Sequence, residues 1–139
     1  MIPYGRQDIN DDDVASVIKV LHSDYLTQGQ AVDEFESALS KYVGSKFSVV
    51  VSSATAALHL VYKALGVGPG KSVWTAPNTF VATANAALYC GASIDFVDID
   101  PKSYTLSIDL LEEKLISTQR SGGKMPDLIV MVHFAGQSC

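Results

Sequence analysis

The sequence predicts an α/β protein with a largely parallel sheet, and three observations support this prediction. From Phe47 onward, short apolar runs alternate with helical patterns in the order β-α-β-α-β-α-β. The apolar runs are nearly continuous, as expected for strands of a sheet that is covered on both faces. A content of 47% hydrophobic and 18% charged residues in 139 residues suits one folded domain.

Two helices are expected before the first strand. Asn10 is a suitable N-cap, the aspartates that follow it favour the positive end of a helix dipole, and apolar residues recur at helical spacing to about His22. A loop then runs to Gly29. Val32 opens a second helical pattern, which Gly44 ends.

Strands and helices are expected to alternate along the rest of the chain. The four predicted strands are residues 47–52, 72–76, 93–99 and 128–134. Between them, the apolar spacing predicts helices at 54–65 and at 79–89. A last helix is expected to begin at Ser107, with Leu106 and Leu111 as a hydrophobic staple around that cap.

Composition argues against several classes of protein. The net charge is -5 and no basic patch is visible, so a nucleic-acid partner is not expected. The longest apolar stretch, residues 47–67, contains polar residues and is not expected to cross a membrane. The N-terminus lacks the features of a signal peptide, and we expect a cytoplasmic location. Cys90 and Cys139 have no metal-binding spacing and are interpreted as ordinary thiols.

The segment VVVSSATAALHL is a potential phosphate site, because a buried strand ends in small hydroxyl residues and a helix follows at once. The first turn of such a helix presents unpaired N–H groups and the positive end of the dipole, and Thr55 adds a hydroxyl. Simple helix capping by Ser52, Ser53 and Thr55 explains the segment equally well. From these residues alone, both interpretations stay open.

A second glycine-rich segment, GVGPGKS at 66–72, is not expected to bind phosphate. A P-loop needs its first glycine at the position of Leu65, and it runs from a strand into a helix, whereas here a helix leads into a strand. We expect the end of a helix followed by a turn.

Phe80 follows the end of a predicted strand, at the start of a helix rich in alanine, threonine and asparagine. An aromatic ring near the carboxyl end of a parallel strand faces the crevice where open α/β sheets bind ligands, and it can lie flat against a planar ring. A place in the core is the ordinary alternative for such a residue.

Asp98 and Asp100 lie two residues apart, before Pro101. The pair could bind a metal or share acid and base work, but capping and turn formation is the better interpretation, because no further ligand accompanies it. His59 is interpreted as structural, and His133 is expected on the ligand side of the sheet.

Taken together, the segments resemble the DegT/DnrJ/StrS family of sugar aminotransferases, which have the aspartate-aminotransferase fold (fold type I) and use pyridoxal 5′-phosphate. The resemblance covers nearly the whole chain. It is carried by the segments Tyr25-Leu-Thr-Gln-Gly29, Ser53-Ala-Thr-Ala-Ala-Leu58, Thr79-Phe-Val-Ala-Thr-Ala-Asn85, Phe96-Val-Asp-Ile-Asp100 and Val132-His-Phe-Ala-Gly136.

The resemblance implies roles for six residues. Ala54 and Thr55 are expected to bind the cofactor phosphate, and Phe80 to stack on the pyridine ring. Tyr25, Thr27 and Gly29 resemble part of the sugar-nucleotide side of the pocket. The two helices before the first strand are expected to form an N-terminal helical arm, residues 1–45. The resemblance implies that residues 46–139 form a partial large domain that binds the cofactor.

The implied reaction transfers an amino group from glutamate to C4 of a UDP-linked 4-keto-6-deoxy sugar, on the way to pseudaminic acid, in a homodimer. Members of the family are more than twice as long as this chain. The lysine that forms the Schiff base, in a Ser-x-x-Lys segment, is expected beyond Cys139. In the family the first strand is also separated from the next three by later strands, so the 139 residues alone are expected to bind the cofactor weakly and not to transaminate.

Two alternatives stay open at this stage. Relatives that carry histidine in place of the lysine act as sugar dehydratases. A non-catalytic regulator or binding module with the same fold is the other alternative, against which the presence of Thr55 and Phe80 argues.

Overall fold

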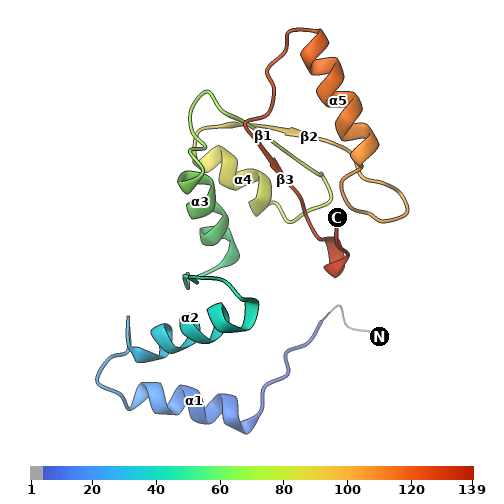
Figure 1. Cartoon of the computed structure of the whole chain (residues 1–139). Coiled ribbons are helices and arrows are strands. Elements are labelled where there is room, and N and C mark those ends of the chain that lie inside the picture. Colours follow the sequence, from blue (N-terminus) through green and yellow to red (C-terminus); the bar gives the residue numbers. More distant parts are fainter. Residues whose placement is uncertain (1–4) are drawn as a thin grey trace. The chain divides into compact units, whose positions relative to one another are not determined.

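The computed structural model describes residues 5–139, which divide into two compact units (Figure 1). The first unit ends at Val50, and the second runs from Val51 to Cys139. The two units are described separately below.

The first unit holds two helices, α1 (Asp11–Leu21) and α2 (Gln30–Val43). The side chain of Asn10 accepts the N–H groups of Asp12 and Asp13, and the Asp13 carboxylate accepts the N–H of Asn10, which forms a complete capping box. Gly44 ends α2 in the left-handed conformation, with φ of 69°. Both predicted helices are confirmed, although α2 begins two residues earlier than expected.

The predicted strand at 47–52 is absent, and that prediction is wrong for this chain. A strand forms only where a neighbouring strand takes up its N–H and carbonyl groups, and no strand in residues 5–139 pairs with this segment. The Glu36 side chain instead accepts the N–H of Val50, at 2.8 Å. Phe47 and Val49 stay exposed.

The second unit is built on a parallel sheet of three strands, β1 (Ser72–Thr75), β2 (Ser93–Phe96) and β3 (Leu128–Val130). The strand order is β2-β1-β3, with Val73 opposite both Ile94 and Leu128. The predicted parallel pairing of these three segments is therefore confirmed. The last two strands end earlier than expected.

Helices cover both faces of this sheet (Figure 1). α3 (Ala54–Ala64) and α4 (Ala82–Tyr89) supply apolar residues to the cluster around Val73, and α5 (Ile108–Arg120) packs on the cluster around Trp74. Because Val73 and Trp74 are consecutive in β1, they point to opposite faces. The architecture is the predicted α/β class, with β1 buried at its centre.

Several local predictions are confirmed by this unit. Ser107 caps α5, and Leu106 and Leu111 belong to one apolar cluster, as a staple requires. The segment after α3 is a turn that leads into β1, with Gly66 and Gly70 at positive φ. Cys90 is buried in the core.

α4 begins at Ala82 and not at Thr79 as predicted. The N–H of Thr79 donates to the carbonyl of Pro77, so residues 77–81 form a turn between β1 and α4. Phe80 consequently lies in a loop. Among the described residues, no helix is long and apolar enough to span a membrane.

Candidate functional site

The start of α3 leaves two backbone donors free. Ser53 is the N-cap, and its hydroxyl accepts the N–H of Ala56 at 3.2 Å, while its carbonyl accepts the N–H of Ala57 at 3.0 Å. The N–H groups of Ala54 and Thr55 have no acceptor within residues 5–139. They are available to an external ligand with oxygen acceptors.

The electrostatics of this helix start favour an anion. The first turns of α1, α2 and α5 each contain at least one acidic residue, which compensates the positive end of the helix dipole. The first turn of α3 contains none, and the same is true of α4. An anionic ligand at the N–H groups of Ala54 and Thr55 would be attracted by the uncompensated positive end of the helix dipole. The half-buried Thr55 would add a hydroxyl donor.

Phe80 presents an exposed aromatic ring in the loop that leads from the carboxyl end of β1 to α4. Its side chain is 74% exposed, so it is not part of the core of this chain. The loop around it is fixed by backbone, because the N–H of Thr83 donates to the carbonyl of Phe80 at 3.0 Å. The side-chain amide of Asn78 also donates to the carbonyl of Tyr104. The ring is thus open to a ligand while its backbone is held.

The N-terminus of α3 and the exposed ring of Phe80 belong to the same unit. α3 packs against α4, and the hydroxyl of Tyr62 in α3 donates to the carbonyl of Thr83 in α4 at 2.9 Å. Four residues of α4 are buried, and they are all small: Ala82, Thr83, Ala86 and Ala87. Figure 1 shows that α3 and α4 both begin on the lower side of this unit, toward which β3 also runs.

The sequence interpretation missed the contact between Tyr62 and Thr83. The only signal in the sequence was spacing, since Tyr62 follows Thr55 by seven residues and therefore lies on the same face of a helix.

Asp100 takes part in a turn at the end of the segment that contains Asp98. One carboxylate oxygen of Asp100 accepts the N–H groups of Lys102 and Ser103, both at 2.8 Å. These N–H groups, that of Ser103 foremost, hold the pKa of Asp100 below its usual value. No cluster of potential metal ligands occurs in the described part of the chain. The turn interpretation of this segment is supported.

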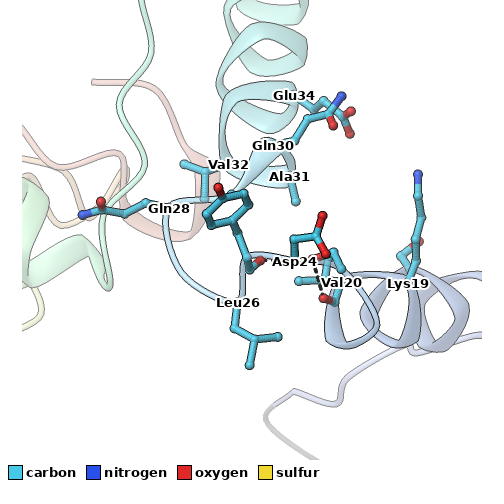
Figure 2. Close-up of a pocket in the computed structure, with 13 residues that line it drawn as sticks. Lys19, Val20, Asp24, Leu26, Gln28, Gln30, Ala31, Val32 and Glu34 are labelled. Atoms are coloured by element: carbon cyan, nitrogen blue, oxygen red, sulfur yellow. Dashed lines mark hydrogen bonds between the residues drawn. The ribbon is translucent and has the colours of Figure 1, made fainter.

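Tyr25, Thr27 and Gly29 lie in the first unit, in the loop between α1 and α2. Tyr25 and Gly29 line a hollow of about 480 Å³, and Thr27 is not part of its wall. In Figure 2, Lys19 and Glu34, which also line it, extend from α1 and α2. The hollow is therefore walled by both helices and by the loop that joins them.

Replacing Gly29 with alanine should loosen this loop. A Cβ at Gly29 would lie 2.9 Å from the carbonyl oxygen of Tyr25, which is too close, so the backbone must shift. We expect a cost of about 1–3 kcal/mol, as for other overpacked sites. Hydrogen exchange of peptides from the α1–α2 loop in the full-length protein should become faster. Gly5→Ala is the matched control, since a Cβ there meets nothing within 4 Å; equal exchange in both variants would contradict the close contact.

Comparison with protein families gives one match over nearly the whole chain. The model described as the DegT/DnrJ/EryC1/StrS aminotransferase family matches residues 7–139.

Curated relatives match over 99% of the chain. The UDP-4-amino-4,6-dideoxy-N-acetyl-beta-L-altrosamine transaminase of Campylobacter jejuni is 44% identical over 138 residues. The spore coat polysaccharide biosynthesis protein SpsC of Bacillus subtilis is 41% identical over 138 residues. The matched regions are 35% and 34% of these relatives, so the chain spans about a third of their length.

Solved structures share the fold. Helicobacter pylori PseC, an aminotransferase involved in the biosynthesis of pseudoaminic acid, matches with a TM-score of 0.87 and 31% identity, over 99% of this chain and 35% of its own. The PLP form of a Streptococcus pneumoniae protein assigned as a sugar aminotransferase matches with a TM-score of 0.86 and 31% identity, over 99% of this chain and 33% of its own.

Proposed function

Because the chain belongs to the DegT/DnrJ/EryC1/StrS aminotransferase family, we propose that it is the N-terminal portion of a sugar aminotransferase that uses pyridoxal 5′-phosphate. We propose further that the start of α3 and the ring of Phe80 form half of the cofactor pocket. The observation that carries this proposal is the pair of free N–H groups at Ala54 and Thr55, in the same unit as an exposed aromatic ring.

The residues present fit the phosphate of this cofactor. Two backbone N–H groups and the Thr55 hydroxyl are donors for phosphate oxygens, and the dipole of α3 favours their negative charge. No acidic residue in the first turn opposes it. Ala54 also has no side chain beyond Cβ that would keep a phosphate from the backbone.

The exposed ring of Phe80 fits the planar pyridine of the cofactor. An aromatic face offers apolar area and a flat surface, and its backbone is held by the hydrogen bond from Thr83. When bound, the cofactor supplies the chemistry of amino transfer by withdrawing electrons from the carbon that loses or gains the proton. The residues of this chain bind it and orient its plane.

The substrate we propose is a nucleotide-linked keto sugar. The support is the Campylobacter jejuni relative, whose name specifies a UDP-linked 4-amino-4,6-dideoxy sugar, and the similarity to Helicobacter pylori PseC. On this basis we propose C4 of a UDP-linked 4-keto-6-deoxy sugar as the acceptor and glutamate as the donor. The hollow at Tyr25 and Gly29, together with Thr27 in the same loop, is our proposal for part of the sugar-nucleotide side of the pocket, in a homodimeric enzyme.

We also propose that none of the eight lysines of this chain attaches the cofactor. In the second unit, Lys71 is paired with Asp127, and Lys114 with Asp95. Lys63 lies in the last turn of α3, at the opposite end from Ala54. The attaching lysine is therefore proposed to lie in the rest of the protein.

Borohydride reduction of the cofactor-loaded full-length protein, followed by peptide mapping, tests this assignment. We expect the reduced adduct on a lysine outside residues 1–139. An adduct on any lysine within them would contradict the proposal. The absence of an adduct in a protein that retains the cofactor would favour the histidine-bearing dehydratases. For the 139 residues alone, we expect weak cofactor binding and no sugar-dependent conversion of glutamate to 2-oxoglutarate.

Replacing Thr55 with valine should weaken cofactor retention by the full-length protein by about 1–3 kcal/mol, the value of a hydrogen bond to a charged group. Valine keeps the shape of threonine and loses only the hydroxyl. Thr118→Val makes the same change in α5 and should leave retention unchanged. Equilibrium dialysis against pyridoxal phosphate measures both, and equal dissociation constants for the two variants would remove the Thr55 hydroxyl from the site.

A further inference from the structure

Tyr62 carries a buried hydroxyl that the proposed pocket does not use directly. The residue is 2% exposed and sits in the cluster of Val67, Val73 and Cys90. Burial, with a smaller contribution from Cys90, raises the pKa of Tyr62, so the hydroxyl stays protonated near neutral pH. A phenylalanine would fill the same space, whereas a buried hydroxyl is tolerated only with a partner. That partner is the carbonyl of Thr83, at 2.9 Å.

Thr83 in turn makes hydrogen bonds to Phe80 and to the residue before it. Its N–H donates to the carbonyl of Phe80 at 3.0 Å. Its hydroxyl lies 2.8 Å from the hydroxyl of Thr79, the residue before Phe80. All three polar groups of Thr83 are thus hydrogen-bonded. Its N–H and hydroxyl bond to the loop before α4, and its carbonyl bonds to Tyr62 in α3. A movement of Thr83 would move the backbone that carries the Phe80 ring.

The same face of α3 connects Tyr62 to the phosphate end. Thr55 and Tyr62 are seven residues apart, which is close to two full turns. Between them, Leu58 packs on the core cluster, and the ring of His59 meets the ring of Tyr89 edge-on, with 5.8 Å between centroids. This face is therefore fixed against α4 along two turns.

We propose that Tyr62 is a positioning residue that couples the phosphate-binding start of α3 to the cofactor-stacking ring of Phe80, an inference that rests on the proposed function. The hydroxyl fixes the first turn of α4 relative to α3, so that the distance between the phosphate contact and the stacking face is set by the protein before the cofactor binds. Such preorganisation reduces the cost of ordering on binding.

The test uses the full-length protein with pyridoxal phosphate as the probe and measures both the dissociation constant and the circular dichroism of the bound cofactor. Tyr62→Phe should raise the dissociation constant about two- to tenfold, the worth of one hydrogen bond. It should also shift the dichroism per bound cofactor toward that of Phe80→Leu, because the ring is held less firmly. Ser107→Ala removes the cap of α5 at a similar cost in stability and should change neither quantity.

A double-mutant cycle distinguishes coupling from a general loss of stability. If Tyr62 acts through Phe80, Tyr62→Phe adds no further weakening once Phe80→Leu is present. Additive effects, or a dichroism that changes equally in Ser107→Ala, would overturn the coupling while leaving the proposed pocket intact. Failure of the wild-type protein to bind pyridoxal phosphate would overturn both.

A second variant keeps the inference testable if Tyr62→Phe does not fold. Thr79→Val removes the hydroxyl pair with Thr83 on the other side of Phe80. It should shift the cofactor dichroism in the same direction as Phe80→Leu. An unchanged dichroism in Thr79→Val would contradict the role of Thr83 as the point that holds the ring.

Discussion

Replacing Ala54 with aspartate should abolish retention of pyridoxal phosphate by the full-length protein. A carboxylate at this position would lie beside the phosphate, and two negative charges about 4 Å apart repel by about 4 kcal/mol at an effective dielectric constant of 20, or about a thousandfold in affinity. The helix itself should not suffer, because an acidic residue in the first turn stabilises it. The change therefore separates ligand binding from folding.

Ala54→Asn is the matched control for this prediction. Asparagine has nearly the same shape as aspartate without the charge, so it should retain the cofactor far better. Both dissociation constants are measured by dialysis, together with the far-UV circular dichroism of each variant. Wild-type affinity in both variants, with folding intact, would mean that no anion binds at the start of α3.

Replacing Trp74 with alanine should destabilise the second unit by about 3–5 kcal/mol, the usual cost of removing a large aromatic side chain from a core. Trp74 is 2% exposed and packs with Ala76, Val97 and Leu106 under α5. The ammonium group of Lys114 also lies 4.6 Å from the centroid of its ring. Loss of this side chain removes the largest member of the apolar cluster on this face of the sheet.

Hydrogen exchange in the full-length protein measures this effect locally. Peptides that cover β1 and β2 should exchange faster in Trp74→Ala, whereas peptides from α1 and α2, which belong to the other unit, should not change. A smaller effect is expected for Trp74→Phe, which keeps most of the ring volume. Unchanged exchange in β1 would contradict the central position of this strand.

Elements with local causes could be predicted from the sequence. Asn10 caps the start of α1 and Gly44 ends α2 with a positive φ. Both act within one helix turn, and the structure confirms both. The three paired strands were also predictable, because their apolar runs need cover on both faces. The strand at 47–52 could not be judged this way, since its apolar pattern says nothing about whether a neighbouring strand is present.

The candidate site was harder to predict from the sequence than the fold was. The segment around Thr55 read equally well as a cap or as a phosphate site, and resemblance to a family decided between them. The structure adds that Ser53 alone supplies the side-chain cap and that two N–H groups remain free. The contact from Tyr62 to Thr83 joins residues 21 apart, which no local pattern reveals.

The central claim is that a helix start and a ring in one compact unit form half of a cofactor pocket. A crystal structure of the full-length protein with bound pyridoxal phosphate tests it most directly. We predict phosphate oxygens about 3 Å from the backbone nitrogens of Ala54 and Thr55, with the pyridine ring parallel to the ring of Phe80. A phosphate bound elsewhere, with both nitrogens hydrogen-bonded to water, would contradict the account.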